Sequence, residues 1–194
     1  IASCALEQSL EGFEFAAGIP GTLGGAVVMN AGAYGGEIKD IIEKAYVLDE
    51  NGKQLELSKE ELDLSYRHSC IPEKKYIVTK VVLELQPQDE AVIRSKMKEL
   101  SEKRAEKQPL QYPSAGSTFK RPEGYFAGKL IMDAGLRGYQ VGGAQVSEKH
   151  CGFVINKGEA TAADICRLMQ DVSDKVQAQF GVVLEPEVKM IGEF

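Results

Sequence analysis

Glycine is concentrated in one short stretch of this chain, and that stretch limits the folds open to it. Residues 18–36 hold seven of the twenty glycines, in the order GIPGTLGGAVVMNAGAYGG. Glycine adopts positive φ freely, and consecutive backbone N–H groups around it can form an anion-binding concavity. The spacing fits neither a Gly-Lys-Ser/Thr phosphate loop nor a Gly-x-Gly-x-x-Gly turn after a strand. On spacing alone, a ligand-binding loop and a tight structural loop both stay open.

Composition excludes several classes of partner. The chain has 194 residues, 43% hydrophobic and 27% charged, with a net charge of -6. A nucleic-acid binder needs a basic face, so we expect no nucleic-acid partner. There is no apolar run of membrane-spanning length and no signal-peptide pattern, so we expect a cytoplasmic protein that does not enter membranes. Nothing in the sequence indicates an obligate protein partner.

The cysteines predict neither disulfides nor a metal site. They stand at Cys4, Cys70, Cys151 and Cys166, without Cys-x-x-Cys spacing. In a chain of this size, buried reduced thiols are the expected form. His68 and Cys70 are close in sequence, but two side chains do not make a metal site. Because the chain begins at Ile1 and its first residues read as part of an element already under way, we expect a fragment of a longer protein.

Local signals predict the elements of the first half. A strand is expected over residues 45–49, followed by an Asn51-Gly52 hairpin turn and a strand over 54–57. Residues 58–61 read as a capping box that opens one helical turn. Alternation and β-branched residues predict a strand over 76–85. Residues 88–107 predict an amphipathic helix that ends before Pro109.

The second half begins after an irregular segment at 108–113, where two prolines stand. A turn-rich run over 114–124, a short helix over 125–134 closed by Gly135, and a strand over 151–156 are expected. A capping signal at 161–164 begins a helix with an apolar stripe that ends at Gly181, and 182–191 predicts a last strand. The fold class is therefore α+β, as two mixed α/β units over residues 1–108 and 109–194.

The glycine-rich stretch carries a resemblance to a known family. GIPGTLGGAVVMNAGAYGGE is similar to the flavin-contacting loop of the UDP-N-acetylenolpyruvoylglucosamine reductases, which share an FAD-binding domain with vanillyl-alcohol oxidases. The resemblance implies part of that domain followed by the family's C-terminal substrate-binding domain, with FAD and NADPH as cofactors. The cofactor-binding residues that it implies are Gly18, Ile19, Pro20, Gly21, Gly24, Gly25, Asn30, Ala31 and Gly32.

Three polar segments extend the resemblance toward catalysis. Ser65-Tyr66-Arg67-His68-Ser69 resembles the family's Tyr-Arg-x-Ser segment, which implies that Arg67 lies by the flavin and the substrate carboxylate. The run SAGSTFKRP at 114–122 is similar to the family's Ala-Gly-Ser-x-Phe-Lys pattern and implies that Ser117 is a proton donor. Glu187 begins a segment, EVKMIG, that resembles the family's closing Glu-Val-x-x-Ile-Gly, which implies a catalytic acid there rather than at Glu185. From the residues alone, a solvated arginine and a solvated acidic face are the more common explanations, and Ser117 could be a turn hydroxyl.

The substrate implied by the resemblance is an anionic UDP-sugar enolpyruvate. The residues implied to bind it are Tyr66, Arg104, Lys107, Lys120, Arg121 and His150. For three of these residues an alternative explanation or a difference from the family pattern remains. Arg104 and Lys107 also read as the basic end of a helix, and Arg121 stands where some relatives have asparagine.

The resemblance runs from about Phe13 to Glu193 and implies the family's shorter form, without its Tyr-bearing insertion. It implies an NADPH-dependent flavoenzyme that reduces UDP-N-acetylglucosamine enolpyruvate to UDP-N-acetylmuramate for peptidoglycan. The family's N-terminal FAD-binding domain is not among these residues, so we expect the chain alone to bind FAD weakly and to have little activity. Two alternatives remain: a non-catalytic nucleotide-sugar-binding module, and another FAD-dependent oxidoreductase of the same superfamily.

Overall fold

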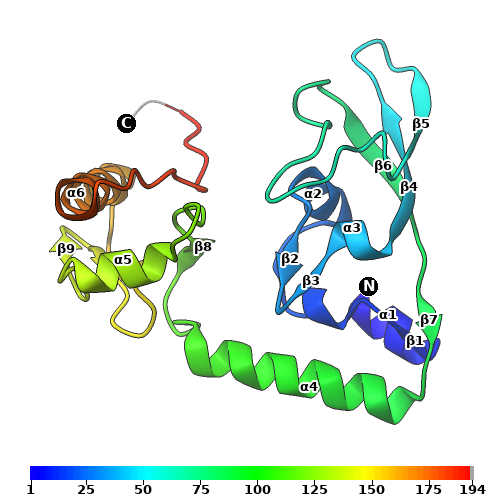
Figure 1. Ribbon diagram of the computed structural model, residues 1–194, viewed down its shortest axis with the longest axis horizontal. Coiled ribbons are helices and arrows are strands. Elements are labelled where there is room, and N and C mark those ends of the chain that lie inside the picture. Colours follow the sequence, from blue (N-terminus) through cyan, green and yellow to red (C-terminus); the bar gives the residue numbers. More distant parts are fainter. Residues whose placement is uncertain (193–194) are drawn as a thin grey trace. The chain divides into compact units, whose positions relative to one another are not determined.

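The computed structural model describes residues 1–192; Glu193, the far end of the resemblance, and Phe194 lie outside the described residues. The chain divides into two compact units, Ile1–Lys103 and Arg104–Phe194, each with its own hydrophobic core. Both units mix helices with antiparallel sheet, which confirms the α+β class (Figure 1). The boundary at 108/109 stays a prediction, since this division falls inside a helix.

The first unit is built around a three-stranded antiparallel sheet in the order β5-β4-β6. The strands are β4 (Ile42–Leu48), β5 (Gln54–Ser58) and β6 (Ile77–Leu83). The Asn51-Gly52 turn is confirmed, because Gly52 has φ +77° and Leu48 pairs with Gln54 across the hairpin. The capping box at 58–61 is confirmed by hydrogen bonds from Ser58 N–H to Glu61 and from Glu61 N–H to Ser58.

Short elements complete this unit. A helix that the sequence did not predict, α2, lies within the glycine-rich stretch and packs on β6. Its core joins α2 to the strands through buried side chains such as Val27, Ala45 and Val47. The remaining elements are α1 (Ala2–Glu7), β1 (Leu10–Glu11), η1 (Glu14–Ala16), α2 (Leu23–Val28), β2 (Gly32–Ala33), β3 (Gly36–Glu37), α3 (Ile38–Ile41) and β7 (Gln86–Pro87).

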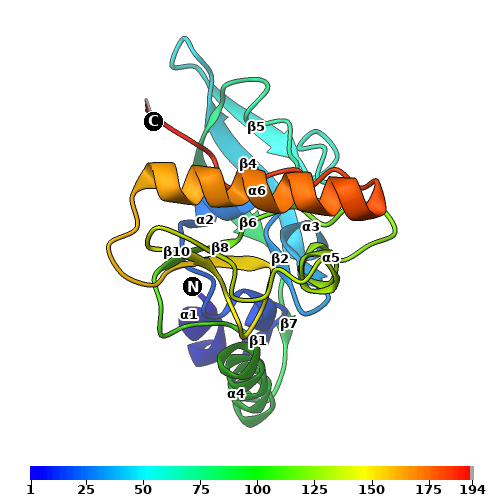
Figure 2. The ribbon, with the colours of Figure 1, turned by 90° about the vertical axis from the view of Figure 1, so that its left-hand side faces the viewer.

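The second unit packs helices on a four-stranded antiparallel sheet in the order β8-β11-β10-β9. Helix α6 (Ala162–Phe180) runs along the sheet against β9, β10 and α5 (Figure 2). The capping box at Thr161 and Asp164 and the left-handed Gly181 bound α6, as the sequence predicted. The other elements are β8 (Ser114–Ser117), α5 (Ala127–Asp133), β9 (Gln140–Val141), β10 (Ala144–Val146) and β11 (Phe153–Asn156).

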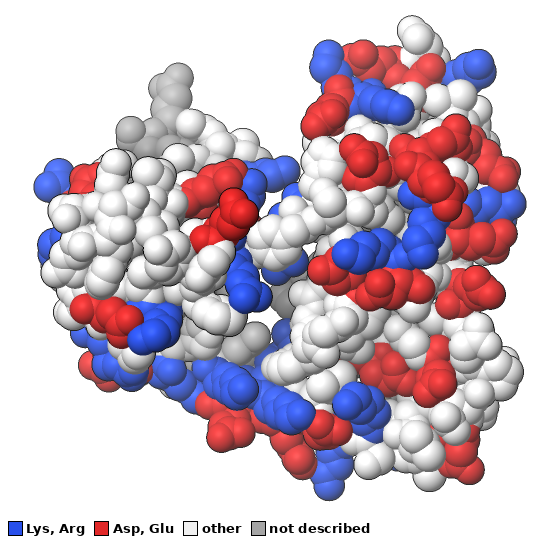
Figure 3. Space-filling view, in the orientation of Figure 1, with Lys and Arg blue, Asp and Glu red and all other residues white. Residues whose placement is uncertain are grey.

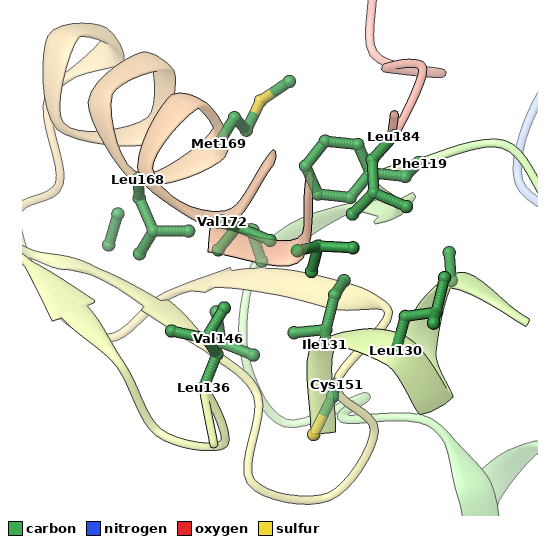
Figure 4. Close-up of a cluster of buried hydrophobic side chains, with 14 residues drawn as sticks. Phe119, Leu130, Ile131, Leu136, Val146, Cys151, Leu168, Met169, Val172 and Leu184 are labelled. Atoms are coloured by element: carbon green, nitrogen blue, oxygen red, sulfur yellow. The ribbon is translucent and has the colours of Figure 1, made fainter. Parts of the chain in front are cut away.

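The core of the second unit lies between α6, α5 and the sheet. Leu168, Val172 and Val176 of α6 are fully buried there, which confirms the predicted apolar stripe except at Phe180, whose side chain is 40% exposed. Figure 4 shows α6 side chains directed toward Val146 of β10 and Ile131 of α5. Burial of several large apolar side chains contributes roughly 1.5–3 kcal/mol each, which makes α6 the main stabilising element of this unit.

Helix α4 (Glu90–Lys107) corrects one prediction. It is not amphipathic, because only Ile93 and Leu100 are buried while Val92 is 52% exposed. Most of α4 does not pack on a hydrophobic core, so its exposed surface consists mainly of charged side chains. Basic and acidic side chains alternate along it, with ion pairs such as Lys103 with Glu99 and Lys98 with Glu102 (Figure 3).

The predicted last strand over 182–191 is also wrong. That segment forms one isolated antiparallel bridge, between Phe119 and Pro186. Pro186 has no N–H to donate, so a continuous ladder cannot form through it. The run at 114–124 is not all turn either, because Ser114–Ser117 pairs with β11 as β8.

Two of the four cysteines differ from expectation. Cys70 and Cys151 are buried free thiols as predicted, and burial raises the pKa of both. Cys4 is exposed because the buried face of α1 is formed by Ala5 and Leu6 instead. Cys166 is partly exposed beside Met190.

Close packing in the second unit depends on a glycine. A Cβ added at Gly143 would lie 2.1 Å from the carbonyl oxygen of Gly158 and 2.4 Å from the nitrogen of Ala160. We expect Gly143→Ala to lower the free energy of unfolding by about 3 kcal/mol, since backbone atoms must move. Gly158→Ala, whose Cβ meets nothing within 4 Å, is the matched control. Urea denaturation measures both, and equal stabilities would contradict this packing argument.

Candidate functional site

The glycine-rich segment lines a cavity in the first unit. The cavity measures about 520 Å³, within the usual range for ligand pockets. Six of the nine predicted cofactor residues line it: Gly18, Ile19, Pro20, Gly21, Gly25 and Ala31. Most of the other lining side chains are apolar and come from α1, η1, α2 and α4, so the walls suit a flat, largely apolar ring. Gly24, Asn30 and Gly32 do not line this cavity.

The glycines of this segment divide into two groups. Gly18 and Gly21 have φ of +79° and +142°, and a Cβ at Gly21 would meet nothing within 4 Å, which leaves space beside the chain. Gly32 and Gly36 are instead required by the fold. A Cβ at Gly32 would lie 2.7 Å from Glu37, and one at Gly36 would lie 2.7 Å from Phe15. The structural alternative therefore holds for Gly32 and Gly36, and the ligand-binding alternative stays a prediction for the glycines that line the cavity.

Asn30 joins the glycine-rich segment to the loop that carries Arg67. Its side chain is 1% exposed and its Nδ2 donates to Glu37 at 2.9 Å and to the Ser65 carbonyl at 3.0 Å. Its Oδ1 accepts from Lys39 N–H at 2.8 Å. The amide is thus occupied by the chain itself, which gives Asn30 a positioning role where the sequence suggested contact with a ring or a phosphate.

The Arg67 loop is fastened at a second point and is locally strained. Ser69, 1% exposed, donates from its hydroxyl to the Val28 carbonyl at 2.8 Å. Ser65 and His68 pair across a tight turn in which Arg67 has φ +54°. An arginine in this left-handed region costs of order 1 kcal/mol, and such strain gathers at functional sites. The guanidinium lies 5.1 Å from the Tyr66 ring centroid, and the side chain of Tyr66 is 48% exposed.

Charge in this region centres on Glu37. The hydrogen bond and ion pair from Lys39, the hydrogen bond from Asn30 and the positive charge of Arg67 lower the pKa of Glu37 despite partial burial. Glu37 therefore stays anionic and compensates cations next to the glycine-rich segment. Sequence reasoning missed Glu37 and Ser69, and the only available signal was their position inside the two quoted motifs.

In the second unit the structure brings Ser117 and Glu187 together across seventy positions of sequence. Ser117 ends β8 opposite Phe153, and Thr118 N–H donates to the Gly152 carbonyl at 2.8 Å. On the other side, Glu187 N–H donates to the Thr118 carbonyl at 2.9 Å. Ser117 is exposed and Glu187 is half-buried, so both reach the surface of one short β-arrangement.

The predicted substrate residues at 120–121 follow directly. Lys120 N–H donates to the Glu185 carbonyl at 2.8 Å, and the Lys120 ammonium pairs with the Glu185 carboxylate. Glu185 thus has a structural partner in Lys120. Arg121 stacks its guanidinium 3.9 Å from the Phe126 ring centroid and donates from Nε to the Tyr125 carbonyl at 3.3 Å.

Basic groups gather at the end of α4. Arg104 and Lys107 lie in its last turn, and Lys149 donates to the Ala105 carbonyl at 2.7 Å, where a cation complements the helix C-terminus. His150 follows Lys149, and the Lys107 charge acts on it. The structure therefore brings the predicted residues Arg104, Lys107 and His150 into one region of the second unit.

His150 is held as a neutral ring. Its Nδ1 accepts from Gly152 N–H at 3.1 Å, which places the proton of the neutral ring on Nε2. The ring packs edge-on against Phe153 with 5.1 Å between centroids. Burial, and secondarily the Lys107 charge, lower the pKa of His150 below its ordinary value of 6.5.

Two absences bear on the site. Within residues 1–192, no three His, Cys, Asp or Glu side chains converge as a metal site requires. No helix of that part of the chain combines the length and apolarity of a membrane span.

The Asn30 bridge predicts a large stability effect. Asn30→Ala removes three buried hydrogen bonds and places alanine at φ +43°, so we expect the first unit to lose about 2–4 kcal/mol. The control is Asn51→Ala in the exposed hairpin turn, expected to cost less than about 0.5 kcal/mol. Urea denaturation of both variants checks this, and similar midpoints would contradict the role assigned to Asn30.

The pKa of His150 predicts a pH effect with a definite sign. Since the folded state binds its proton more weakly than the unfolded state, stability is present above about pH 6.5 and is lost as the pH falls below it. We expect the free energy of unfolding to fall from about pH 7 to pH 5, and His150→Gln to reduce that dependence. His68→Gln serves as the control. Parallel pH profiles for wild type and His150→Gln would overturn the prediction.

Comparison with known proteins agrees with this geometry. A family model described as the UDP-N-acetylenolpyruvoylglucosamine reductase C-terminal domain matches residues 108–191, and an FAD binding domain model matches residues 2–58. A curated UDP-N-acetylenolpyruvoylglucosamine reductase of Agathobacter rectalis is 68% identical over 100% of this chain and 62% of its own length. That of Lachnoclostridium phytofermentans is 66% identical over 96% of this chain and 60% of its own length.

A solved structure extends the likeness to the fold. The crystal structure of UDP-N-acetylenolpyruvylglucosamine reductase from Thermus caldophilus superimposes with a TM-score of 0.84 at 38% identity, over 96% of this chain and 67% of that one. The chain spans about three fifths of the length of the two curated relatives, at 62% and 60%. Because sequence, family models and fold agree over nearly all of its residues, the chain belongs to the UDP-N-acetylenolpyruvoylglucosamine reductase family.

Proposed function

We propose that the protein containing this chain is an NADPH-dependent flavoenzyme that reduces UDP-N-acetylglucosamine enolpyruvate to UDP-N-acetylmuramate, a precursor of peptidoglycan. The family assignment supports the reaction class. The observation that carries the assignment of residues is the backbone pairing of Thr118 with Glu187, which brings the segment of the predicted proton donor next to that of the predicted acid. The match of residues 108–191 to the reductase C-terminal domain favours this reaction over other flavin chemistry.

The first unit supplies a place for part of the FAD. The cavity of about 520 Å³ has apolar walls and glycines with space beside them, features that fit a planar ring system. In this proposal Gly18, Gly21 and Gly25 let the backbone approach the cofactor, and Asn30 fixes the segment that carries them. Bound FAD, reduced by NADPH, supplies hydride to the β carbon of the enolpyruvyl double bond.

The residues of the chain would handle the charge that this addition creates. Negative charge develops at the α carbon and spreads into the substrate carboxylate. Arg67 suits that carboxylate because a guanidinium donates two parallel hydrogen bonds to it. Glu187 would act in its protonated form as a further donor to the substrate. Fixed donors aimed at developing charge are the strongest general source of catalysis.

Ser117 would complete the reduction by donating its hydroxyl proton to the α carbon. Serine is a weak acid, but the carbanion-like carbon that receives the proton is a strong base. The Ser117 side chain is exposed, so water can return its proton afterwards. Lys120, Arg121, Arg104, Lys107, Tyr66 and His150 are proposed to bind the anionic nucleotide-sugar portion.

Ser117→Ala tests the chemical role. In the protein that contains this chain, we expect kcat for enolpyruvyl reduction to fall by about 10²–10⁴-fold, the usual worth of a general acid. NADPH consumption reports turnover, and stopped-flow flavin absorbance reports the half-reaction with NADPH, which should not change. Ser114→Ala, on the same exposed strand, should retain activity. Unchanged kcat in Ser117→Ala, or an equal loss in the NADPH half-reaction, would refute the role of Ser117.

A further inference from the structure

The segment that follows Ser117 ends in an exposed pair of stacked side chains. Arg121 lies with its guanidinium carbon 3.9 Å from the centroid of the Phe126 ring. The side chain of Phe126 is 60% exposed and that of the adjacent Tyr125 is 47% exposed. A guanidinium this close to a ring centroid is a stacked cation–π contact, and both flat groups remain open to a ligand.

The pair is held rigidly by the backbone around it. Pro122 confines Arg121 to extended conformations, and Tyr125 N–H donates to the Pro122 carbonyl at 3.1 Å. Arg121 Nε closes the same turn on the Tyr125 carbonyl at 3.3 Å. Phe126 is the N-cap of α5, whose first amides, those of Lys129 and Leu130, donate to its carbonyl. The stacked pair therefore needs little ordering when a ligand arrives, which favours binding.

Its position relative to the reacting end of the site is also informative. Ser117 and Arg121 are four residues apart along an extended, bridged segment, a span of roughly 13 Å at the rise of a β-strand. Lys120 lies between them, with its ammonium held by the Glu185 carboxylate. Along this segment the order of residues follows the order of the substrate. The Arg121 and Phe126 pair corresponds to the base, Lys120 to the diphosphate, and Ser117 to the sugar substituent.

We propose that Arg121 and Phe126 form a stacking platform that binds the nucleobase of the nucleotide-sugar substrate. This inference rests on the proposed function and names the part of the substrate that each residue recognises. The flat faces of a phenyl ring and a guanidinium stack on heteroaromatic bases without hydrogen-bond readout. Arg121 thus binds the base rather than a phosphate, and Phe126 becomes a binding residue that the motifs did not indicate.

Calorimetric titration of the chain with UDP tests the platform. We expect Phe126→Leu, which keeps an apolar side chain and removes the flat ring, to weaken UDP binding roughly tenfold, a typical worth of one base–aromatic stack. Phe126→Tyr should retain the wild-type affinity. Phe180→Leu, at another exposed phenylalanine of the same unit, should leave it unchanged. Thermal denaturation of each variant verifies folding.

Titration with other ligands tests whether Phe126 acts on the base of the nucleotide or on its phosphates. Inorganic pyrophosphate, which has no base, should bind wild type and Phe126→Leu equally. AMP tests base selectivity: a Phe126 effect on AMP no larger than that on UDP is compatible with the platform, because stacking does not read the identity of the base. Equal UDP affinity in Phe126→Leu, or a Phe126 effect confined to AMP, overturns the platform. Absence of UDP binding to wild type at millimolar concentration also overturns it, since Arg121, Phe126 and Lys120 all belong to one unit.

These outcomes are distinct from failure of the proposed function. If UDP binds through Phe126 but the protein containing this chain does not oxidise NADPH with the enolpyruvyl substrate, the reaction assignment fails and the platform stands. If reduction proceeds normally in Phe126→Leu with unchanged KM, the platform fails and the reaction assignment stands.

Discussion

Thr118 is the residue on which the geometry of the second unit depends. Thr118 is 3% exposed, and its polar groups pair with two segments that lie on either side of it. Its N–H donates to the Gly152 carbonyl, its hydroxyl accepts from Val154 N–H at 2.9 Å, and its carbonyl accepts from Glu187 N–H. Buried polar groups are costly when unpaired, so this arrangement fixes the segment firmly. Ser117 precedes it and Lys120 follows it, so every proposed contact from this segment inherits that placement.

In the first unit, a buried side-chain amide and a buried hydroxyl hold the loop segments in place. Asn30 and Ser69, each 1% exposed, tie the Arg67 loop to the glycine-rich segment through the Ser65 and Val28 carbonyls. The glycines then serve two purposes in one run, since Gly32 and Gly36 permit close packing, while Gly18 and Gly21 line the cavity and Gly21 leaves space there. A motif that looks uniform in sequence is therefore part scaffold and part cavity wall.

Several positive side chains lie in the second unit, although the chain as a whole is acidic. The net charge is -6, yet Arg104, Lys107, Lys120 and Arg121 all lie in the second unit, where an anionic nucleotide-sugar is proposed to bind. Along α4 the charges are balanced by pairs three and four residues apart, each worth only a few tenths of a kcal/mol. Local convergence of a few cations, rather than the overall balance, is what can attract such a substrate.

Sequence alone determined the features that depend on neighbouring residues. The Asn51-Gly52 hairpin, the Thr161 capping box and the Gly135 helix end, where Gly135 N–H donates to Met132, follow from backbone chemistry within a few positions. Sequence resemblance also identified the family. Tertiary structure alone decided the features that join distant residues, such as the Glu187 to Thr118 pairing and the burial of Asn30. The helix predicted over 88–107 is confirmed as α4, but its apolar face and the strand over 182–191 failed for the same physical reason. Burial and strand pairing depend on a partner surface, and that surface is set by the fold and not by the segment itself.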